Sequence, residues 1–395
     1  MPSDAETVDS LTDQRVLVLH HAYREPGGEE RYAGQLFELL QRRAGAVHSL
    51  SRLSSETGSG RAAAGLLSGG LDPSEVARVV KETGTTVVHA HNIHPTYGWR
   101  ALAAARRAGA AVVLHLHNYR LYCSIGIAFR DGHDCDQCAR RRTWHAVAHN
   151  CRDSVPESAV YGAALGLWQR RLIDSVDVFA SPTARLAQDL EEQRFDLPLE
   201  VLPTWLPDGE FVSQSACADG EYALFAGRVT EDKGVFVAIE ASARSGVPLR
   251  IAGDGPAIDD ARELVSRLRA PVEFLGHVNG QALVAARMGA AFCVVPSLWR
   301  EVLPFSALEA LAAGLPLVVS GGGGLDELTD QPLVAERGSA SSLESVMRLV
   351  FEDRTLRAEA GARSLERARA RFSEQAYVGA LTDVYDRAVR ARAAG

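Results

Sequence analysis

Short apolar runs alternate with longer amphipathic stretches along almost the whole chain, and this pattern restricts the fold more than any other feature. Runs that are apolar nearly throughout are typical of strands covered by helices on both faces, and the stretches between them are long enough for crossover helices. The predicted strands are residues 15–19, 86–89, 111–116 and 176–180, then 222–226, 249–252, 272–275, 291–295 and 317–319. The predicted helices are residues 30–43, 73–83 and 97–108, then 233–245, 257–268, 280–288, 304–313, 340–351 and 374–393.

The pattern occurs twice, which predicts an α/β protein with two facing doubly wound domains. A chain of 395 residues also exceeds the size at which one hydrophobic core stops growing. The boundaries predicted from the pattern are a disordered leader over 1–14, a first domain over 15–203, a second domain over 204–374, and a helix over 375–395 that crosses back to the first domain. In such sheets ligands bind at the carboxyl ends of the strands, so we expect function in the loops that follow strands.

Composition excludes several classes of protein. The net charge of −8 argues against nucleic acid as a partner, although a local basic pocket for an anionic small molecule is compatible with it. No apolar run is long enough for a transmembrane helix. The polar, acidic start MPSDAETVDSLTDQ does not resemble a signal peptide, so we expect a cytoplasmic protein.

Two glutamates, Glu301 and Glu309, are the strongest functional signal. Pro304 suits the first turn of a helix, and SALEALAAG continues it to a Gly stop, so Glu301 precedes the helix and Glu309 lies inside it. Helix amides attract phosphate oxygens, and the carboxylates would accept hydrogen bonds from sugar and ribose hydroxyls. The segment predicted to face donor phosphates is Leu303, Pro304 and Phe305.

A second signal is the loop GRVTEDKG, which follows the predicted strand 222–226. Arg228 and Lys233 on this loop supply a guanidinium and an ammonium, which together suit a diphosphate. Negative charge grows on the diphosphate as a sugar leaves, so these cations would stabilise the transition state more than the bound donor. Taken alone, an ordinary turn with two exposed cations is the simpler interpretation.

With these motifs, and with Ala-Gly-Leu-Pro at 313–316 before a Gly-rich turn, the chain resembles the retaining glycosyltransferases of family 4, which have the GT-B fold. The resemblance implies that Glu301 touches the donor sugar and Glu309 the ribose. It also implies that Arg228 and Lys233 replace a metal ion, so no catalytic metal is expected. Backbone groups would hydrogen-bond the base at Gly276, His277 and Val278. Glu327, after the glycines, is a weaker candidate for closing the sugar pocket.

The loops of the first half carry weaker signals. The resemblance places Gly27 and Gly28 beneath the donor phosphate, although an ordinary loop is the alternative. It also implies that His117, after the third predicted strand, meets the donor sugar. The family commonly has Asp at the next position, whereas this chain has Asn118, so a negative charge is missing there. Further histidines near strand ends, interpreted as structural or acceptor-side, are His20, His89, His91 and His94.

A cysteine-rich insert is predicted over residues 118–152. The spacing C-x11-C-x2-C-x12-C favours tetrahedral structural zinc, with no metal, an iron–sulfur cluster or a disulfide as alternatives. Four sulfur ligands leave no position for water, so we expect no catalytic role. A subgroup of the same glycosyltransferases is similar in this stretch. The cysteines are Cys123, Cys135, Cys138 and Cys151.

Basic residues near the cysteines raise the question of an anionic acceptor. Arg140, Arg141 and Arg142, with Arg152, would suit a phosphorylated or lipid-linked acceptor and peripheral membrane contact. A solvated basic surface is the plainer interpretation.

Taken together, the motifs predict a retaining glycosyltransferase that moves a sugar from a nucleotide-diphosphate sugar to a hydroxyl acceptor. No enzymic nucleophile stands out, which is compatible with displacement on the same face of the sugar. The alternatives are an epimerase of the same fold and a catalytically silent nucleotide-binding subunit. A pyridoxal-dependent phosphorylase fits poorly, because the only lysines are Lys81, on a predicted surface helix, and Lys233.

Overall fold

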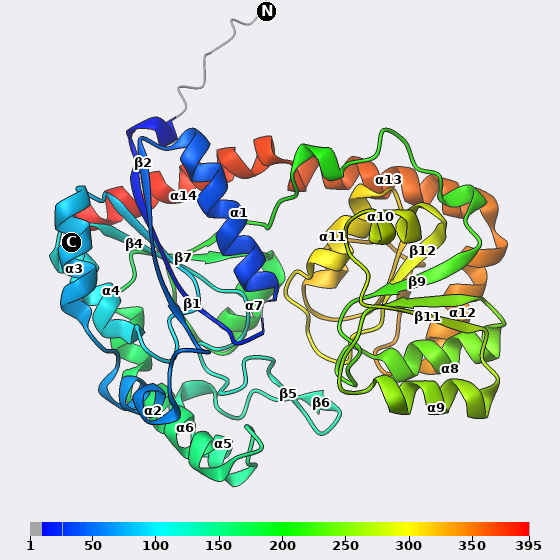
Figure 1. Cartoon of the computed structure of the whole chain (residues 1–395), viewed down its shortest axis with the longest axis horizontal. Helices are drawn as coiled ribbons and strands as arrows, with labels where there is room; N and C mark the ends of the chain where they lie inside the picture. The colour runs from blue at the N-terminus through cyan, green and yellow to red at the C-terminus, as the bar shows by residue number, and fades with distance from the viewer. Residues whose placement is uncertain (1–9, 26, 395) are drawn as a thin grey trace, which may run out of the picture.

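The computed structural model describes residues 10–25 and 27–394. Two six-stranded sheets, in which every paired strand is parallel, form the two halves of the molecule (Figure 1). The strand orders are β2-β1-β3-β4-β7-β8 and β11-β10-β9-β12-β13-β14, which confirms the predicted pair of doubly wound, Rossmann-like units. The strands are β1 (Arg15–Ala22), β2 (Ala46–Leu53), β3 (Val87–Ala90), β4 (Ala111–His115), β7 (Val178–Ser181), β8 (Leu199–Val201), β9 (Tyr222–Ala226), β10 (Leu249–Ala252), β11 (Val272–Gly276), β12 (Ala290–Val295), β13 (Leu317–Ser320) and β14 (Val334–Ala335).

Helices cover both faces of each sheet, as the apolar strands predict. In the first half, one face packs on α1 and α14 and the other on α3, α4, α6 and α7; in the second, one packs on α10, α11 and α13 and the other on α8, α9 and α12. These helices, with α2 and α5, are α1 (Gly28–Arg43), α2 (Ser59–Ser68), α3 (Pro73–Thr83), α4 (Gly98–Arg107), α5 (His145–Ala148), α6 (Val155–Ile173), α7 (Ala184–Glu192), α8 (Val235–Ser245), α9 (Ile258–Leu268), α10 (Gly280–Met288), α11 (Phe305–Ala312), α12 (Ala340–Glu352), α13 (Arg354–Phe372) and α14 (Glu374–Ala394). None of the described helices is both long and apolar enough to span a bilayer.

The last helix, α14, leaves the second half and lies along the first sheet (Figure 1). Its buried side chains join the core formed by α1 and the middle of that sheet. The hydroxyl of Tyr377 lies 2.6 Å from that of Tyr32 on α1, and the ring of Trp205 stacks on Tyr377 with centroids 3.8 Å apart. The chain therefore joins its two halves twice, once near Trp205 and once through α14.

The structure also differs from the sequence-based expectations. Residues 10–13, which were predicted to belong to the disordered leader, form a short 3-10 helix whose Leu11 is fully buried; residues 1–9 of that leader lie outside the described residues. Strand β2 was missed because it lies at the sheet edge, where half-buried and exposed positions alternate and no apolar run forms. The prediction also omitted α2, α6, α7, α13 and the short strands β8 and β14.

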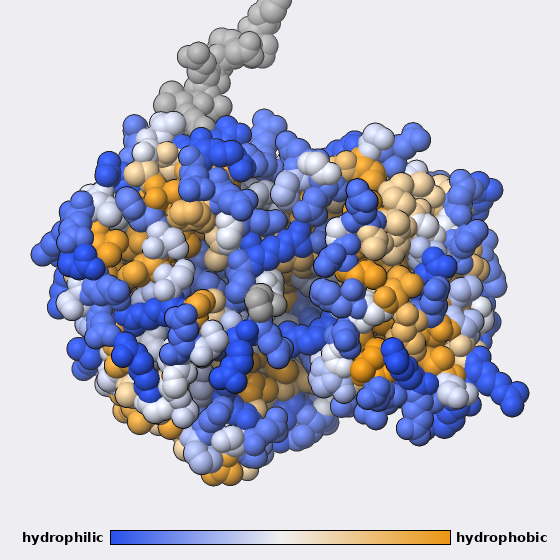
Figure 2. Space-filling view, viewed as in Figure 1, coloured by the Kyte–Doolittle hydropathy of each residue, from blue (hydrophilic) through white to orange (hydrophobic). Residues whose placement is uncertain are grey.

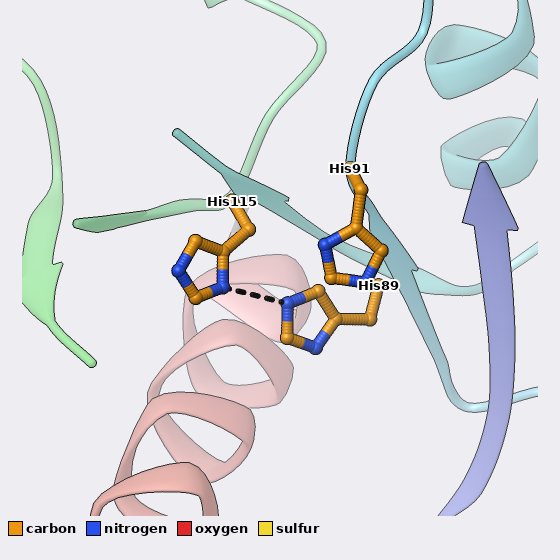
Figure 3. Close-up of side chains that lie close together, drawn as sticks. All are labelled: His89, His91 and His115. Atoms are coloured by element: carbon orange, nitrogen blue, oxygen red, sulfur yellow. Dashed lines mark hydrogen bonds between the residues drawn. The ribbon is translucent and has the colours of Figure 1, made fainter. Parts of the chain in front are cut away.

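Four histidines, of which three are buried and His117 is half-buried, form a stack at the carboxyl ends of β3 and β4. These strands are neighbours, and residues two apart in a strand point to the same face, which brings the rings together. Nε2 of His89 lies 3.4 Å from Nδ1 of His115, and Nδ1 of His91 lies 3.0 Å from Nε2 of His117 (the first contact is drawn in Figure 3). The hydroxyl of Tyr385 on α14 lies 2.9 Å from Nδ1 of His89, so the stack contacts the crossing helix.

Three of these rings also have the spacing of metal ligands. His89, His91 and His115 each offer a nitrogen within 4.8 Å of the others. Both nitrogens of His89, however, already have hydrogen-bonding partners, Tyr385 and His115. Figure 3 shows the rings of His89 and His115 meeting nitrogen to nitrogen, as in a hydrogen bond. We therefore interpret the group as a hydrogen-bonded part of the core.

Burial keeps these rings uncharged. It lowers the pKa of His89 and of His117 to about 3, and it lowers the pKa of His91 and of His115 well below the ordinary value. The unfolded chain would bind protons at these positions near pH 6.5, whereas the folded chain would not. Stability is therefore expected to fall as the pH is lowered from about 6.5 toward 3.

Replacing His89 with Gln removes one such group. We expect the variant to show a shallower dependence of unfolding free energy on pH, by up to about 1.4 kcal/mol per pH unit below pH 6.5. Urea unfolding at a series of pH values measures this slope. The matched control is the exposed His277→Gln, which is expected to keep the wild-type slope. Equal slopes in the two variants would contradict the assignment.

Candidate functional site

A buried carboxylate, Glu301, lies in the loop between β12 and α11. Its Oε1 accepts a hydrogen bond of 2.7 Å from the hydroxyl of Ser297 and forms an ion pair with Nζ of Lys233. Lys233 comes from the loop after β9, and its Nζ also lies 5.1 Å from the ring centroid of Trp299. Residues from two adjacent strand ends therefore meet here, as their parallel pairing requires.

The glycine-rich turn after β13 supports the backbone of Glu301. The amide of Gly324 donates to the carbonyl of Glu301 over 2.6 Å. A Cβ atom at Gly324 would lie 1.8 Å from the carbonyl oxygen of Val302, and one at Gly323 would lie 2.5 Å from that of Glu301. Only glycine fits this approach, which explains the glycine run. Glu327, the weaker candidate for closing the sugar pocket, accepts hydrogen bonds from the backbone amide of Arg185 and from the side chain of Arg371.

Glu309 lies inside α11 and contacts both halves of the molecule. One carboxylate oxygen pairs with Arg287 of α10 and the other with Arg31 of α1. Arg31 also pairs with Glu210 at 3.0 Å, and its guanidinium carbon lies 4.1 Å from the ring centroid of Phe305. The pairing spans 278 positions in sequence, so Arg31 had no local signal that marked it as a site residue.

The remaining donor-side candidates lie at neighbouring strand ends in the second half. Arg228 is exposed on the loop after β9, beside the turn that follows β10: a Cβ at Gly253 would lie 1.8 Å from the carbonyl oxygen of Gly227. The carbonyl of Gly276, at the end of β11, accepts a hydrogen bond from the amide of Gly253 over 2.8 Å. His277 is exposed and Val278 is half-buried, as are Leu303, Pro304 and Phe305 at the start of α11.

The first half faces this group across the interface between the domains. Gly27 caps α1, its amide donating to Glu30 over 2.7 Å, and a Cβ at Gly28 would lie 3.5 Å from the ring of Phe305. Figure 2 shows a hollow between the two lobes that hydrophilic residues border. His117 lies after β4, with its ring 4.4 Å from that of His115 and nearly parallel to it. The predicted residues from both halves therefore lie at facing edges of the two sheets.

Three polar residues next to His117 and Gly28 had no motif to mark them as functional. Nδ2 of Asn118 donates to Oε1 of Glu29 over 2.8 Å, and Oδ1 of Asn118 accepts from the amide of Arg120 over 2.9 Å. Burial raises the pKa of Glu29. The carboxylate beside the histidine thus comes from Glu29, and an amide at position 118 is what can donate to it.

The cysteine-rich insert places its four thiols near enough to influence one another, although among the described residues no three of their sulfur atoms lie within 4.8 Å of one another. Burial raises the pKa of the Cys138 thiol to about 12, and the nearby Cys123, Cys151 and Cys135 raise it further. All four thiols are free. The spacing of the cysteines in the sequence suits a tetrahedral zinc ion, and binding would require the sulfur atoms to move closer together and the thiols to lose their protons.

The insert also docks on the second half. Arg300, next to Glu301 and only 6% exposed, donates to Asp136 over 2.6 Å. Arg337 donates to both oxygens of Asp134 at 2.9 and 2.7 Å. The arginines predicted as an acceptor-binding run, Arg140, Arg141 and Arg142, are exposed, while Arg152 pairs with Glu157 at 3.3 Å.

Comparison with known proteins places this site in context. Residues 210–367 match the family model described as glycosyl transferases group 1. The chain is 41% identical over 116 residues to an uncharacterized glycosyltransferase of Methanocaldococcus jannaschii, and 34% identical over 174 residues to a glycogen synthase of Mycobacterium tuberculosis. The aligned parts span 28% and 41% of this chain, and 30% and 41% of the length of those relatives.

Solved structures share the whole fold. Sucrose-phosphate synthase of Thermosynechococcus elongatus superimposes with a TM-score of 0.69 at 17% identity, covering 97% of this chain and 100% of the other. HepE of Anabaena, solved with UDP and glucose, gives 0.65 at 15% identity over 94% and 99% of the two chains. The fold is therefore that of GT-B glycosyltransferases. Residues 210–367 match the glycosyl transferases group 1 model, and this match and the curated relatives support a transferase enzyme.

Proposed function

We propose that the protein is a retaining glycosyltransferase of family 4, in the subgroup with a four-cysteine insert, that uses a nucleotide-diphosphate sugar and a hydroxyl acceptor. The observation that carries this proposal is the contact between Glu301 and Lys233 at the carboxyl edge of the second sheet, with Arg228 on the same loop as the lysine. A carboxylate for sugar hydroxyls thus stands beside cations for a diphosphate.

In the proposed reaction, the sugar–oxygen bond of the donor breaks and the leaving diphosphate gains negative charge. Arg228 and Lys233 would stabilise that charge without a catalytic metal, helped by amides at the start of α11. Glu301 would accept hydrogen bonds from the donor sugar, and neutral His117 would face the sugar from the first half. The acceptor oxygen would attack from the side that the diphosphate leaves, and a diphosphate oxygen would take its proton.

Glu309 is the proposed partner of the ribose hydroxyls. Both of its oxygens hold arginines in this structure, Arg31 and Arg287, so a ribose would share the carboxylate with them or displace Arg31. Arg31 belongs to the first half, so nucleotide binding would change a contact between the halves.

The proposed donor site predicts the behaviour of an Arg228→Ala variant. Calorimetric titration with UDP, GDP, ADP and dTDP should find one nucleotide that binds the wild type, and UDP is placed first because HepE was solved with it. Loss of one charged donor to the diphosphate should weaken binding by about tenfold or more. Arg267→Ala, an exposed arginine on α9, is the control and should bind like the wild type. Absence of binding to all four nucleotides would favour a catalytically silent subunit over an active transferase.

Glu301→Gln tests the proposed sugar contact. The neutral amide keeps the size of the side chain but weakens hydrogen bonds that strengthen as the sugar leaves, so kcat should fall by about 10². Proton NMR of the reaction follows the rate, and it should show a product with the anomeric configuration of the donor. Glu263→Gln, on the exposed side of α9, should keep the wild-type rate. An inverted product, or a C4 or C2 epimer of the donor in place of a transfer product, would contradict the proposal.

We expect the four cysteines of the insert to be the ligands of a structural zinc ion. The described thiols form no disulfides, which suits the proposed cytoplasmic location. Purified protein should contain one zinc per chain by elemental analysis. Cys138→Ser should lose that metal and lower the melting temperature, while Cys293→Ser, in the core of the second sheet, should keep the metal. Full metal content in the Cys138 variant would rule out the site.

A further inference from the structure

A small cavity opens at the carboxyl edge of the first sheet, next to the turn that meets Phe305. Its volume is about 40 Å³, which is room for about three water-sized groups. Glu29 lines it directly after Gly28, the residue whose Cβ would lie 3.5 Å from Phe305 of the second half. The cavity thus lies beside the proposed donor site. The polar side chains that line it include Glu29, His91, His94, His115, Asn118 and Arg120.

Several of these side chains present buried polar atoms with no partner. Within the described residues, Oε2 of Glu29, Nε of Arg120, Nε2 of His91 and Nε2 of His115 have no hydrogen bond. His91 and His115 are each only 2% exposed. Buried polar groups in folded proteins are almost always hydrogen-bonded, so a site with four unpaired ones favours a bound group that supplies the missing hydrogen bonds.

The arrangement of the unpaired atoms also indicates which kind of group is bound. The carboxylate of Glu29 accepts hydrogen bonds and Arg120 can only donate them. Burial raises the pKa of Glu29, so this site disfavours further negative charge. Burial lowers the pKa of His94 to about 3 and lowers that of His91 well below the ordinary value, so these histidines add no charge. A hydroxyl can donate to the carboxylate and accept from the guanidinium, whereas a phosphate would bring negative charge beside Glu29.

We propose that this cavity binds the hydroxyl edge of a neutral polyhydroxylated acceptor, such as a sugar or a cyclitol. Asn118 positions both charged residues, because its amide holds Oε1 of Glu29 and its oxygen holds the backbone of Arg120. The exposed arginines at 140–142 take no part in it. This inference rests on the proposed function and names the acceptor class for the same site.

The test uses the full chain, with the donor nucleotide identified by calorimetry. The donors are the glucose, galactose, mannose and N-acetylglucosamine conjugates of that nucleotide. The neutral acceptor probes are glucose, mannose and myo-inositol, and a phosphate ester of each is tested beside it. Neutral probes should be acceptors. In Glu29→Gln, the KM for the neutral probe should rise by about tenfold or more, because the amide accepts hydrogen bonds less strongly than the carboxylate. Arg120→Lys should raise it similarly, since the donor atom is displaced.

Nucleotide affinity separates this inference from the proposed function. Both variants should keep the nucleotide Kd of the wild type within about twofold, which also verifies that they fold. Glu25→Gln changes an exposed glutamate on the loop before α1; it is the matched control and should keep the wild-type KM. Three outcomes would overturn the inference while nucleotide binding still supports the donor site. They are transfer only to the phosphorylated probes, transfer to no probe, and an unchanged KM in Glu29→Gln. Failure of the wild type to bind any nucleotide would overturn both.

Discussion

A buried guanidinium, that of Arg300, ties the two halves together one residue away from Glu301. It donates to Asp136 over 2.6 Å, lies 3.5 Å from Asp189, and stands 5.0 Å from the ring centroid of Tyr119, all in the first half. Leaving a buried charge without its partner typically costs about 3–5 kcal/mol, so this contact strongly favours one placement of the halves. Glu301 sits between Arg300 and the Gly-rich turn, and its position in the cleft depends on both.

The cysteine-rich insert supplies the first-half side of the contact with Arg300. Asp136 lies between Cys135 and Cys138, and Asp134 directly precedes Cys135. Both aspartates reach arginines of the second half, Arg300 and Arg337. An ion held by the cysteines would therefore stabilise the loop on which the contact between the halves depends, without touching the reacting atoms.

Local pattern was enough for much of the fold, because the central strands are fully buried and therefore apolar. Strand β2 escaped detection because its edge position leaves polar residues in alternation. The donor-side motif could be predicted from the sequence because Glu301, Pro304 and Glu309 are close together in it. The contact of Arg31 with Glu309 could not be predicted, because the two residues are far apart in sequence and meet only in the folded protein. Glu29 was hidden for another reason: acids at a helix start are common, and its partner Asn118 comes from a different strand end.

The two edges of the cleft differ in charge in a way that suits a division of roles. The second half presents Arg228 and Lys233, and the first half presents histidines that burial keeps neutral. The most direct test of this arrangement is a crystal structure of the protein with its nucleotide bound. The diphosphate should contact the side chains of Arg228 and Lys233, with the ribose at Glu309. The central claim would be contradicted by a diphosphate bound elsewhere. It would also be contradicted by a nucleotide base at Glu301, where the donor sugar is expected.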